Sequence, residues 1–370
     1  MKFTINVQDL QEGLSTVTRA LAARPAKQIL DGVLIVADDN RLTLTCSDGS
    51  FSIEYTNAAD VKESGQAVLP GKLLTEMIRK LPGGEVTLAV QNNRLANIRC
   101  LKNHSNISVM DAAEYPEITP VKNGAEVRIQ QDKLKDMISR VMFAMATDES
   151  RQILTGCLME VSRTEARLVA LDGFRLGLRK LFQPFDLPDG KEVVKAIIPG
   201  KVITEMSRIL PDDEAFCRLM VGDGRFQCEF GNIRMYSVLL GGEYIDYRRI
   251  LPTEFGTEIK ANRVALLEAM DRASLMAREG KNNLIRMSIR DGLVKITSNA
   301  DLGDVEEEVE ISLIGKELDI AFNAKYIIDV IRSISEDEVV LKFNTNVSPC
   351  VVTPKEGDDY VYLILPVRVF

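Results

Sequence analysis

The sequence predicts an α+β protein made of three repeated domains, each with two helices packed on antiparallel sheet. One stretch occurs three times: PGKLLTEMIRKLP at residues 70–82, PGKVITEMSRILP at residues 199–211, and a looser copy, NAKYIIDVIRSI, from Asn323. Lys72, Lys201 and Lys325 mark its register and lie 129 and 124 residues apart. A spacing near one domain length indicates one unit used three times. Similar strand and hairpin signals recur around each copy.

Each unit is expected to open with a strand that leads into a helix. In the first unit residues 3–7 form the expected strand, and a helix with an apolar stripe follows from about Asp9. Leu10 in this stripe is equivalent to Leu134 and Leu266 in the later units.

A hairpin is expected next. Residues 33–46 predict a hairpin that turns at positions 38–40, and residues 287–297 predict another that turns at Asp291 and Gly292. An Asp-Gly pair between alternating strands favours a type I′ turn, because that turn needs positive φ at both central residues.

The repeated stretch is expected to be the second helix of each unit. Pro70 and Pro82 bound its first copy. The expected apolar stripe consists of Leu73, Leu74, Met77, Ile78 and Leu81. Lys72 and Arg79 stay outside this stripe. A solvated face is the ordinary interpretation for one such helix, but cations kept at the same places in three units favour a common partner.

A second hairpin and a final strand are expected to complete each unit. The hairpins turn at residues 92–93 and 223–224 in the first two units, and the last strand covers residues 362–370. The resulting domains are 1–122, 126–252 and 256–370, joined by short, turn-rich linkers.

Composition is typical of a globular protein. The 370 residues are 45% hydrophobic and 27% charged, and no apolar run approaches the ~20 residues of a membrane span. The N-terminal residues lack the apolar core of a signal peptide. Six cysteines without a C-x-x-C pair indicate reduced core thiols. We therefore expect a cytoplasmic protein with no membrane partner.

Charge is distributed unevenly along the chain. The net charge is −8, which taken alone argues against nucleic acid. The six expected helix windows, extended to flanking positions such as Lys27 and Arg140, nevertheless carry 17 basic and 10 acidic residues. A cationic set of helices on an acidic body suits a polyanion bound on one surface and repelled elsewhere.

Motifs for catalysis or cofactor binding are missing. His104 is the one histidine, so a hydrolytic triad or a histidine-rich metal site is not expected. There is no phosphate loop, and the stretch from Gly222 lacks the third glycine of a dinucleotide fingerprint. We expect no cofactor and no catalytic residue, although acid/base chemistry by distant carboxylates stays an alternative. Without tryptophan, base stacking is not favoured, which points to phosphate contacts.

Several motifs together resemble one family across the whole chain. They are MKFT at the start, Arg24-Pro25, DGFRL at 172–176, IIPGK at 197–201, DYRRILP at 246–252, DRASLMAREGKNN at 271–283 and LILPVR at 363–368. They resemble the bacterial DNA polymerase III beta subunits, the sliding clamps, and the last two are similar to those of Gram-positive bacteria.

The resemblance implies a non-enzymatic processivity factor. Two chains would form a head-to-tail ring in which six domains place twelve helices around duplex DNA. Arg24, Lys72, Arg140 and Lys201 would then contact phosphates without reading sequence. The loop around Thr147 and Asp148 departs from family members that carry His-Gln there, so no DNA contact is assigned to it.

The resemblance also implies a hydrophobic pocket that receives short peptides from the DNA polymerase III alpha subunit, the clamp loader, other polymerases and repair proteins. The pocket maps to Leu154, Leu171, Gly173, Arg175, Leu176, Ile245, Arg249, Ile250, Val347, Leu363, Ile364, Leu365, Pro366, Val367 and Arg368. Without the resemblance these residues would be interpreted as linker and core. Leu171 and Phe174 replace the threonine and histidine of some relatives.

Ring closure would join the first unit of one chain to the third unit of another. Ile107 and Val109 lie on a candidate edge strand, and Leu275 and Met276 on the facing helix. A repeat scaffold that binds peptides without encircling DNA is the main alternative, followed by an enzyme with a carboxylate site.

Overall fold

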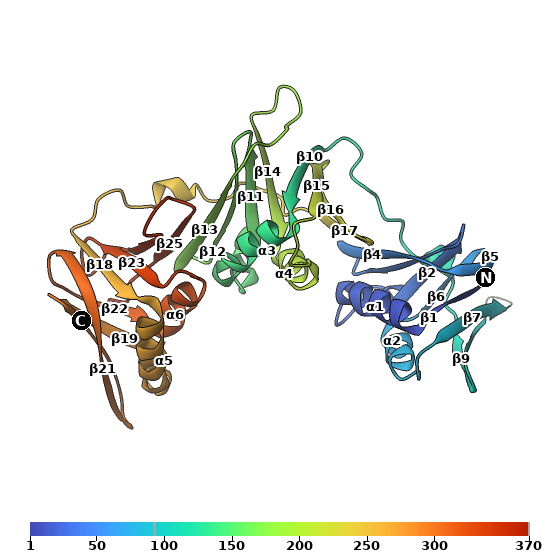
Figure 1. Ribbon diagram of the computed structural model, residues 1–370, viewed down its shortest axis with the longest axis horizontal. Coiled ribbons are helices and arrows are strands. Elements are labelled where there is room, and N and C mark those ends of the chain that lie inside the picture. The colour runs from blue at the N-terminus through green and yellow to red at the C-terminus, as the bar shows by residue number, and fades with distance from the viewer. Residues whose placement is uncertain (92–93, 369–370) are drawn as a thin grey trace. The chain divides into compact units, whose positions relative to one another are not determined.

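Three similar α+β repeats follow one another along the chain in the computed structural model, which describes residues 1–91 and 94–368 (Figure 1). Each repeat contains two helices among antiparallel strands, and every strand pair among the described residues is antiparallel. The predicted fold class is confirmed.

The elements of the three repeats have the following bounds. The first repeat contains β1 (Lys2–Asn6), α1 (Val7–Val17), β2 (Gly32–Asp38), β3 (Arg41–Ser47), β4 (Phe51–Ala58), β5 (Asp60–Glu63), β6 (Gly65–Pro70), α2 (Gly71–Arg79), β7 (Glu85–Gln91), β8 (Leu95–Cys100) and β9 (Asn103–Ser108). The second contains β10 (Ala125–Gln130), α3 (Gln131–Ser139), β11 (Gly156–Ser162), β12 (Glu165–Leu171), β13 (Arg175–Phe182), β14 (Val193–Pro199), α4 (Gly200–Ile209), β15 (Phe216–Gly222), β16 (Arg225–Phe230) and β17 (Ile233–Val238). The third contains β18 (Thr257–Asn262), α5 (Arg263–Glu279), β19 (Leu284–Arg290), β20 (Leu293–Ala300), β21 (Gly303–Gly315), β22 (Leu318–Asn323), α6 (Ala324–Arg332), β23 (Glu338–Phe343), β24 (Cys350–Thr353) and β25 (Tyr360–Ile364).

The chain forms two compact units, because sheets continue from one repeat into the next. The first unit comprises Met1–Gln131 and Arg208–Leu239, and the second Asp132–Ser207 and Leu240–Phe370. In the first unit β17 pairs with β4 within an eight-stranded sheet, and a five-stranded sheet has the order β5-β1-β7-β8-β9. In the second unit β13 pairs with β25, which joins strands of two repeats in a twelve-stranded sheet. The predicted domain bounds stay predictions.

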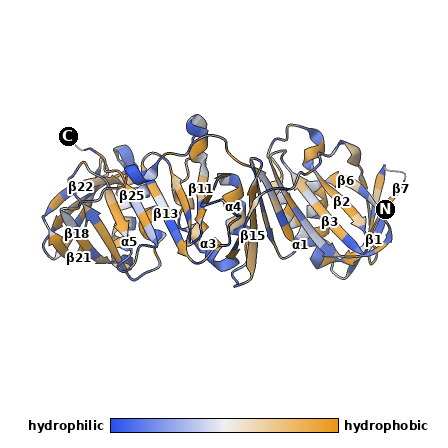
Figure 2. Ribbon diagram, turned by 90° about the horizontal axis from the view of Figure 1, so that it is seen from above, coloured by the Kyte–Doolittle hydropathy of each residue, from blue (hydrophilic) through white to orange (hydrophobic). Residues whose placement is uncertain are grey.

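Helices cover the apolar face of the strands within each unit. In the first unit α1 lies beside α2 and packs on β3 and β4, and in the second α5 lies beside α6 and packs on β20 and β21 (Figure 1). Hydrophobic and hydrophilic residues occur together along the strands (Figure 2). Along β2, Val33, Ile35 and Ala37 are fully buried, whereas Leu34 and Val36 between them are half-buried. This period of two is that of a strand with one covered face.

The hairpin turns follow the expected residues, with one difference. Asp39 and Asn40 both have positive φ, as do Asp223 and Gly224. In the Asp291–Gly292 turn only the glycine has positive φ (75°), so that turn is not of type I′. The predicted turn at residues 92–93 lies outside the described residues.

The repeated helices are confirmed, but the expected stripe of α2 is too wide. Leu74 and Ile78 are completely buried, whereas Leu73 is 49% exposed. A helix of this length buries one narrow face, and Leu73 lies beside that face. Prediction of Leu73 as a core residue is therefore wrong.

Two further differences concern strands. The strands before each repeated helix, β4 to β6, β13 and β14, and β21 and β22, were not anticipated. The last strand, β25, ends at Ile364 rather than reaching residue 370, since Pro366 has no backbone N–H to donate to a ladder.

The interior is apolar in every repeat. All six cysteines are buried and free, as expected for a reduced core. Among the described residues, each helix is too short or too polar to cross a membrane.

Candidate functional site

Four of the expected pocket residues form the floor of an apolar site in the second unit. Leu154, Leu171, Leu176 and Leu363 belong to one buried cluster, which also includes the ring of Tyr247. Leu171 pairs with Leu176 across the β12–β13 hairpin, and Leu176 pairs with Leu363 of β25. Neighbouring strands thus bring residues nearly 200 positions apart into one floor.

Exposed apolar side chains lie at the same end of this sheet. Arg175 at the start of β13 and Cys350 at the start of β24 both pair with Ile364 at the end of β25. The segments before β13 and β24 and the segment after β25 therefore meet at this end of the sheet. The large apolar side chains that these segments and residues 244–250 leave exposed are Phe174, Ile245, Ile250, Val347 and Leu365. An apolar floor with exposed apolar anchors suits the capture of a short peptide.

The turn between β12 and β13 is built by its own residues. One carboxylate oxygen of Asp172 accepts hydrogen bonds from the backbone N–H groups of Phe174 (2.9 Å) and Arg175 (3.0 Å). Gly173 has φ +92°, a conformation that favours glycine. These hydrogen bonds close the turn and leave the Phe174 ring at the surface. There it stacks on the ring of Tyr326, with 5.6 Å between the two ring centroids. Tyr326 is a site residue that the sequence reasoning missed.

The buried side chain of Arg175 supports the residues around the apolar site. Its side chain is only 7% exposed and lies against the rings of Phe143 and Tyr326. It forms ion pairs with Asp172 (3.0 Å) and Asp329 (2.7 Å). Hydrogen bonds and charge from Lys325 and Arg175 lower the pKa of Asp329, although burial opposes this shift. Direct contact of Arg175 with a peptide is therefore not expected.

The C-terminal segment closes one side of the site. Leu365 donates its backbone N–H to the carbonyl oxygen of Phe174 (2.8 Å), and Val367 donates to that of Ala321 (2.8 Å). Pro366 is half-buried, and Arg368 is exposed. On another side Arg249 is exposed and pairs with Asp246. These cations add charge to an otherwise apolar rim.

The predicted phosphate contacts divide into two groups. Arg24, Lys72 and Lys201 are exposed, in positions compatible with binding a polyanion. Neither Arg24 nor Lys72 forms an ion pair with any residue that the structure describes.

Arg140 belongs to the second group. The side chain is 11% exposed and pairs with Asp136 (2.6 Å). It also donates to Ser335 (2.8 Å) and lies 3.8 Å from Glu336. These partners hold the guanidinium within the fold, so we expect Arg140 to stabilise the fold rather than to contact phosphate.

The charge of the helices also differs from expectation. Within their observed bounds the six α-helices of the described residues carry eleven basic and ten acidic residues. The expected cationic surplus thus lies in segments that flank the helices, among them Arg24, Lys27 and Lys80.

Two copies of the repeated helix, α2 and α6, differ in whether their cations form ion pairs. In α6, Lys325 pairs with Asp329 (2.7 Å), and Arg332 pairs with Asp271 (3.0 Å). In α2, exposed Lys72 and Arg79 form no ion pair with the described residues. The first copy is therefore the better phosphate-binding surface of these two.

Free strand edges exist in both units. β9 is an edge strand of its sheet, paired on one side with β8. In the second unit, Gly303–Glu310 of β21 pairs with β20 on one side, and no other strand of the described residues covers its other side. Leu275 is 63% exposed, and the Met276 side chain lies 3.7 Å from the position that a Cβ would take on Gly303, so both predicted residues lie near this edge.

Ile107 lies on the edge strand β9, as predicted, but its side chain is not at the surface. Its side chain is 4% exposed and packs within its own unit. The next predicted residue, Val109, is half-buried. At this edge the backbone of β9 is available for pairing, whereas the Ile107 side chain is not.

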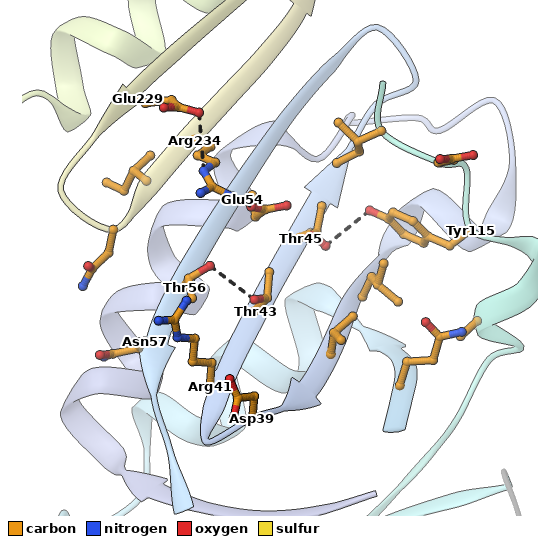
Figure 3. A pocket seen from close by; sticks show the side chains of 18 of the residues that line it. Asp39, Arg41, Thr43, Thr45, Glu54, Thr56, Asn57, Tyr115, Glu229 and Arg234 are labelled. Atoms are coloured by element: carbon orange, nitrogen blue, oxygen red, sulfur yellow. Dashed lines mark hydrogen bonds and ion pairs between the residues drawn. The ribbon is translucent and has the colours of Figure 1, made fainter. Parts of the chain in front are cut away.

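A broad cavity of about 1290 Å³ lies on the outward face of the eight-stranded sheet in the first unit (Figure 3). Its floor includes Thr43, whose hydroxyl is hydrogen-bonded to that of Thr56 (3.2 Å). Its charged wall is neutralised, because Arg234 pairs with Glu54 (3.2 Å) and Glu229 (3.5 Å). The cavity was not anticipated, and the two threonines and three charged residues named here already have partners. The described residues contain no group of three potential metal ligands.

Comparisons with known proteins agree along the whole chain. Models of the N-terminal, central and C-terminal domains of the DNA polymerase III beta subunit match residues 1–119, 128–246 and 248–368. The beta sliding clamps of Bacillus subtilis and Staphylococcus epidermidis are each 34% identical, over 100% of both chains.

Solved structures give the same result. The DNA polymerase sliding clamp of Bacillus subtilis matches with a TM-score of 0.95 at 34% identity. A Pseudomonas aeruginosa sliding clamp bound to griselimycin matches with a TM-score of 0.92 at 28% identity. Each comparison covers 100% of both chains.

Proposed function

The chain belongs to the family of DNA polymerase III beta subunits, the beta sliding clamps, and from this premise we propose how its residues act in DNA replication. The protein is a processivity factor, an accessory subunit without a catalytic site of its own. The observation that carries this conclusion is the full-length match of three repeats to clamps in both sequence and structure. A cytoplasmic location stays a prediction.

Two chains form a closed ring around duplex DNA and slide along it. Lys72 and Arg79 on α2, with Lys80 and the loop residue Arg24, supply loose phosphate contacts. Such contacts are independent of sequence and weaken with salt, so they allow movement along the duplex. Topology, rather than affinity, keeps the ring on DNA. Lys201 is a further proposed contact, whereas Arg140 is not.

The ring closes head to tail by pairing of strand edges. β9 of one chain adds to the free part of β21, Gly303–Glu310, of a second copy. An exposed edge offers unpaired N–H and C=O groups for this pairing. Charge favours it: exposed Asp304 and Glu308 lie on β21, although Glu306 between them already pairs with Lys295 (2.6 Å), and exposed Arg99 lies on β8 beside β9. Leu275 and Met276 supply apolar contact near the same edge.

The apolar site in the second unit holds peptide segments of partner proteins. We propose the DNA polymerase III alpha subunit, the clamp loader, other polymerases and repair proteins as its partners. The support is the shared floor of four leucines and the exposed Phe174, Ile245, Ile250, Val347 and Leu365 around it. Polymerase held in this way stays near the primer end while the ring slides.

Primer extension tests this function. DNA polymerase III and a bacterial clamp loader extend a primer on circular single-stranded DNA, with and without the protein. We expect products to lengthen strongly when the protein is present, because polymerase no longer dissociates between short extensions. Unchanged product length would favour the alternative of a peptide-binding scaffold that does not encircle DNA.

A further inference from the structure

A buried carboxylate lies beside the proposed peptide site and has no assigned role. Glu160 on β11 is 4% exposed, although acidic side chains are almost never buried unless they are paired. The side chain has three partners. Lys195 of β14 donates to one carboxylate oxygen (3.0 Å), and the other oxygen accepts from Tyr247 (2.8 Å) and Arg248 (2.6 Å).

Two of these partners belong to a segment that shapes the site. Tyr247 and Arg248 are consecutive residues of a short 3-10 helix, Tyr247–Arg249, in the segment 244–250. Both donate to the same carboxylate oxygen, so one acidic side chain of the sheet anchors this segment. Arg248 also lies over the Tyr247 ring, 4.5 Å from its centroid.

Tyr247 connects Glu160 to the pocket floor. Its ring is 2% exposed and packs in the cluster with Leu154, Leu171 and Leu363, while its hydroxyl donates to Glu160. The same segment presents Ile245 and Ile250 on the surface. A shift of Tyr247 would therefore move the floor and one wall together.

Few other contacts could replace the carboxylate. Arg167 approaches the Tyr247 hydroxyl at 3.5 Å, the limit of a hydrogen bond, and its own Nε is buried without a partner. Tyr244 donates to the carbonyl oxygen of Val169 at 3.4 Å, which is also a long contact. Glu160 makes the shortest polar contacts of this segment with the sheet.

We propose that Glu160 is a positioning residue for partner binding: it holds segment 244–250 in the form that accepts a peptide, without touching the peptide. The inference rests on the proposed peptide-binding function of this site. Removal of the charge would leave Lys195 and Arg248 without their shared anion and would loosen the segment. A peptide would then have to order the segment on binding, which lowers affinity.

The test uses the full chain and four variants. Glu160→Gln removes the charge and keeps the shape, and Tyr247→Phe removes the hydroxyl and keeps the ring. The double variant carries both changes. Glu54→Gln is the matched control, because Glu54 on β4 of the first unit is also a largely buried carboxylate and pairs with Arg234 and not with the segment. The probe is a fluorescein-labelled peptide from the C-terminal tail of a DNA polymerase III alpha subunit, measured by anisotropy.

We expect Glu160→Gln to lower the affinity for the peptide roughly three- to tenfold, on the scale of one lost charged hydrogen bond. Glu54→Gln should change affinity less than about twofold, because its ion pair with Arg234 lies in the first unit, away from the peptide site. The double variant should bind no more weakly than the weaker single variant, because both changes act through one contact. Hydrogen exchange of residues 244–250 should accelerate in Glu160→Gln, a local change that general destabilisation would not confine to this segment.

Wild-type affinity in Glu160→Gln, or an equal loss in Glu54→Gln, would overturn the proposal. An additive loss in the double variant would also contradict action through Tyr247. If the unmodified protein itself does not bind the peptide, the peptide-binding function fails and the inference falls with it. Far-ultraviolet circular dichroism of Glu160→Gln at room temperature is a separate check on folding, and its spectrum should match that of the wild type.

Discussion

Arg140 shows at the scale of one residue that a cation near a helix end can serve the fold instead of a ligand. Its guanidinium reaches Asp136 one helical turn earlier and also the segment after α6, including Ser335. From sequence it was expected to contact phosphate like Lys72, because both are basic residues of expected helix windows. The difference depends on acidic and polar partners far away in the chain, which spacing alone does not reveal.

Replacement of Arg140 by Met should therefore reduce stability and leave DNA contacts unchanged. We expect a loss of about 1–3 kcal/mol in the free energy of unfolding, the usual effect of leaving charged hydrogen-bond partners unsatisfied. Lys72→Met, its exposed counterpart, should stay within about 0.5 kcal/mol of the wild type. Urea unfolding measures both. Equal stability of the two variants would contradict the assignment.

The stability that the ionised Glu160 side chain provides should be lost at acid pH. Hydrogen bonds from Lys195, Arg248 and Tyr247 lower the pKa of this carboxyl below its ordinary value of 4.5, although burial opposes them. A depressed pKa in the folded state contributes stability above the unfolded pKa and loses it as pH falls through the folded pKa. The melting temperature of the wild type should exceed that of Glu160→Gln at pH 7.

The difference between these two melting temperatures should shrink as pH falls below 4.5. Thermal unfolding followed by circular dichroism at a series of pH values measures it. A difference that stays constant down to the acid transition would mean that the ionised form of Glu160 is not the stabilising one.

At the scale of the element, the helix α2 separates core from surface within two neighbouring residues. Leu74 is completely buried and Leu73 is 49% exposed. We expect Leu74→Ala to cost about 3 kcal/mol of unfolding free energy, as for other buried leucines, and Leu73→Ala less than about 1 kcal/mol. Chemical denaturation of the two variants compares them. Similar losses in the two variants would mean that Leu73 also belongs to the core, as the sequence predicted.

The repeated helix also offers a matched test of charge. Lys72 and Arg79 of α2 occupy the same places as Lys325 and Arg332 of α6, but among the described residues only the α6 pair is neutralised by ion pairs. Glutamate at both α2 positions should lower the salt dependence of binding to labelled duplex DNA by about one to two units of slope, on the scale of one unit per phosphate contact.

Glutamate at both α6 positions should change that slope less. Binding isotherms at several salt concentrations give the slopes of all three proteins. An equal effect of the two double variants would mean that ion pairing does not decide which copy contacts phosphate.

Elements with strong periodic signals could be predicted from sequence, and those without them could not. The hairpin from β2 to β3 and the three repeated helices carry turn residues or apolar periodicity in a short window. The strands β5 and β6 were missed because they are short and lack such signals. The end of β25 was placed too late, since the apolar run continues beyond Pro366.

The candidate site was less accessible to sequence reasoning than the fold. Its floor joins Leu154, Leu171 and Leu363, which alone look like ordinary core residues. Only the resemblance brought them together. Glu160 and Tyr326 escaped notice, because each acts through partners that are distant in sequence.

At the scale of the whole molecule, the central claim is that the protein holds DNA by topology. The free edges of β9 and β21, the unpaired cations of α2 and the family membership all support a ring that slides. Surface binding by charge alone would instead depend on affinity and would not distinguish circular from linear DNA.

Topological retention is the measurement that tests this claim most directly. The protein is loaded on nicked circular plasmid with a bacterial clamp loader and ATP, the complex is isolated, and the plasmid is then linearised. Our account predicts retention on the intact circle and release after linearisation, because a closed ring slides off free ends. Equal retention on circular and linear DNA would contradict it and would indicate ordinary surface binding.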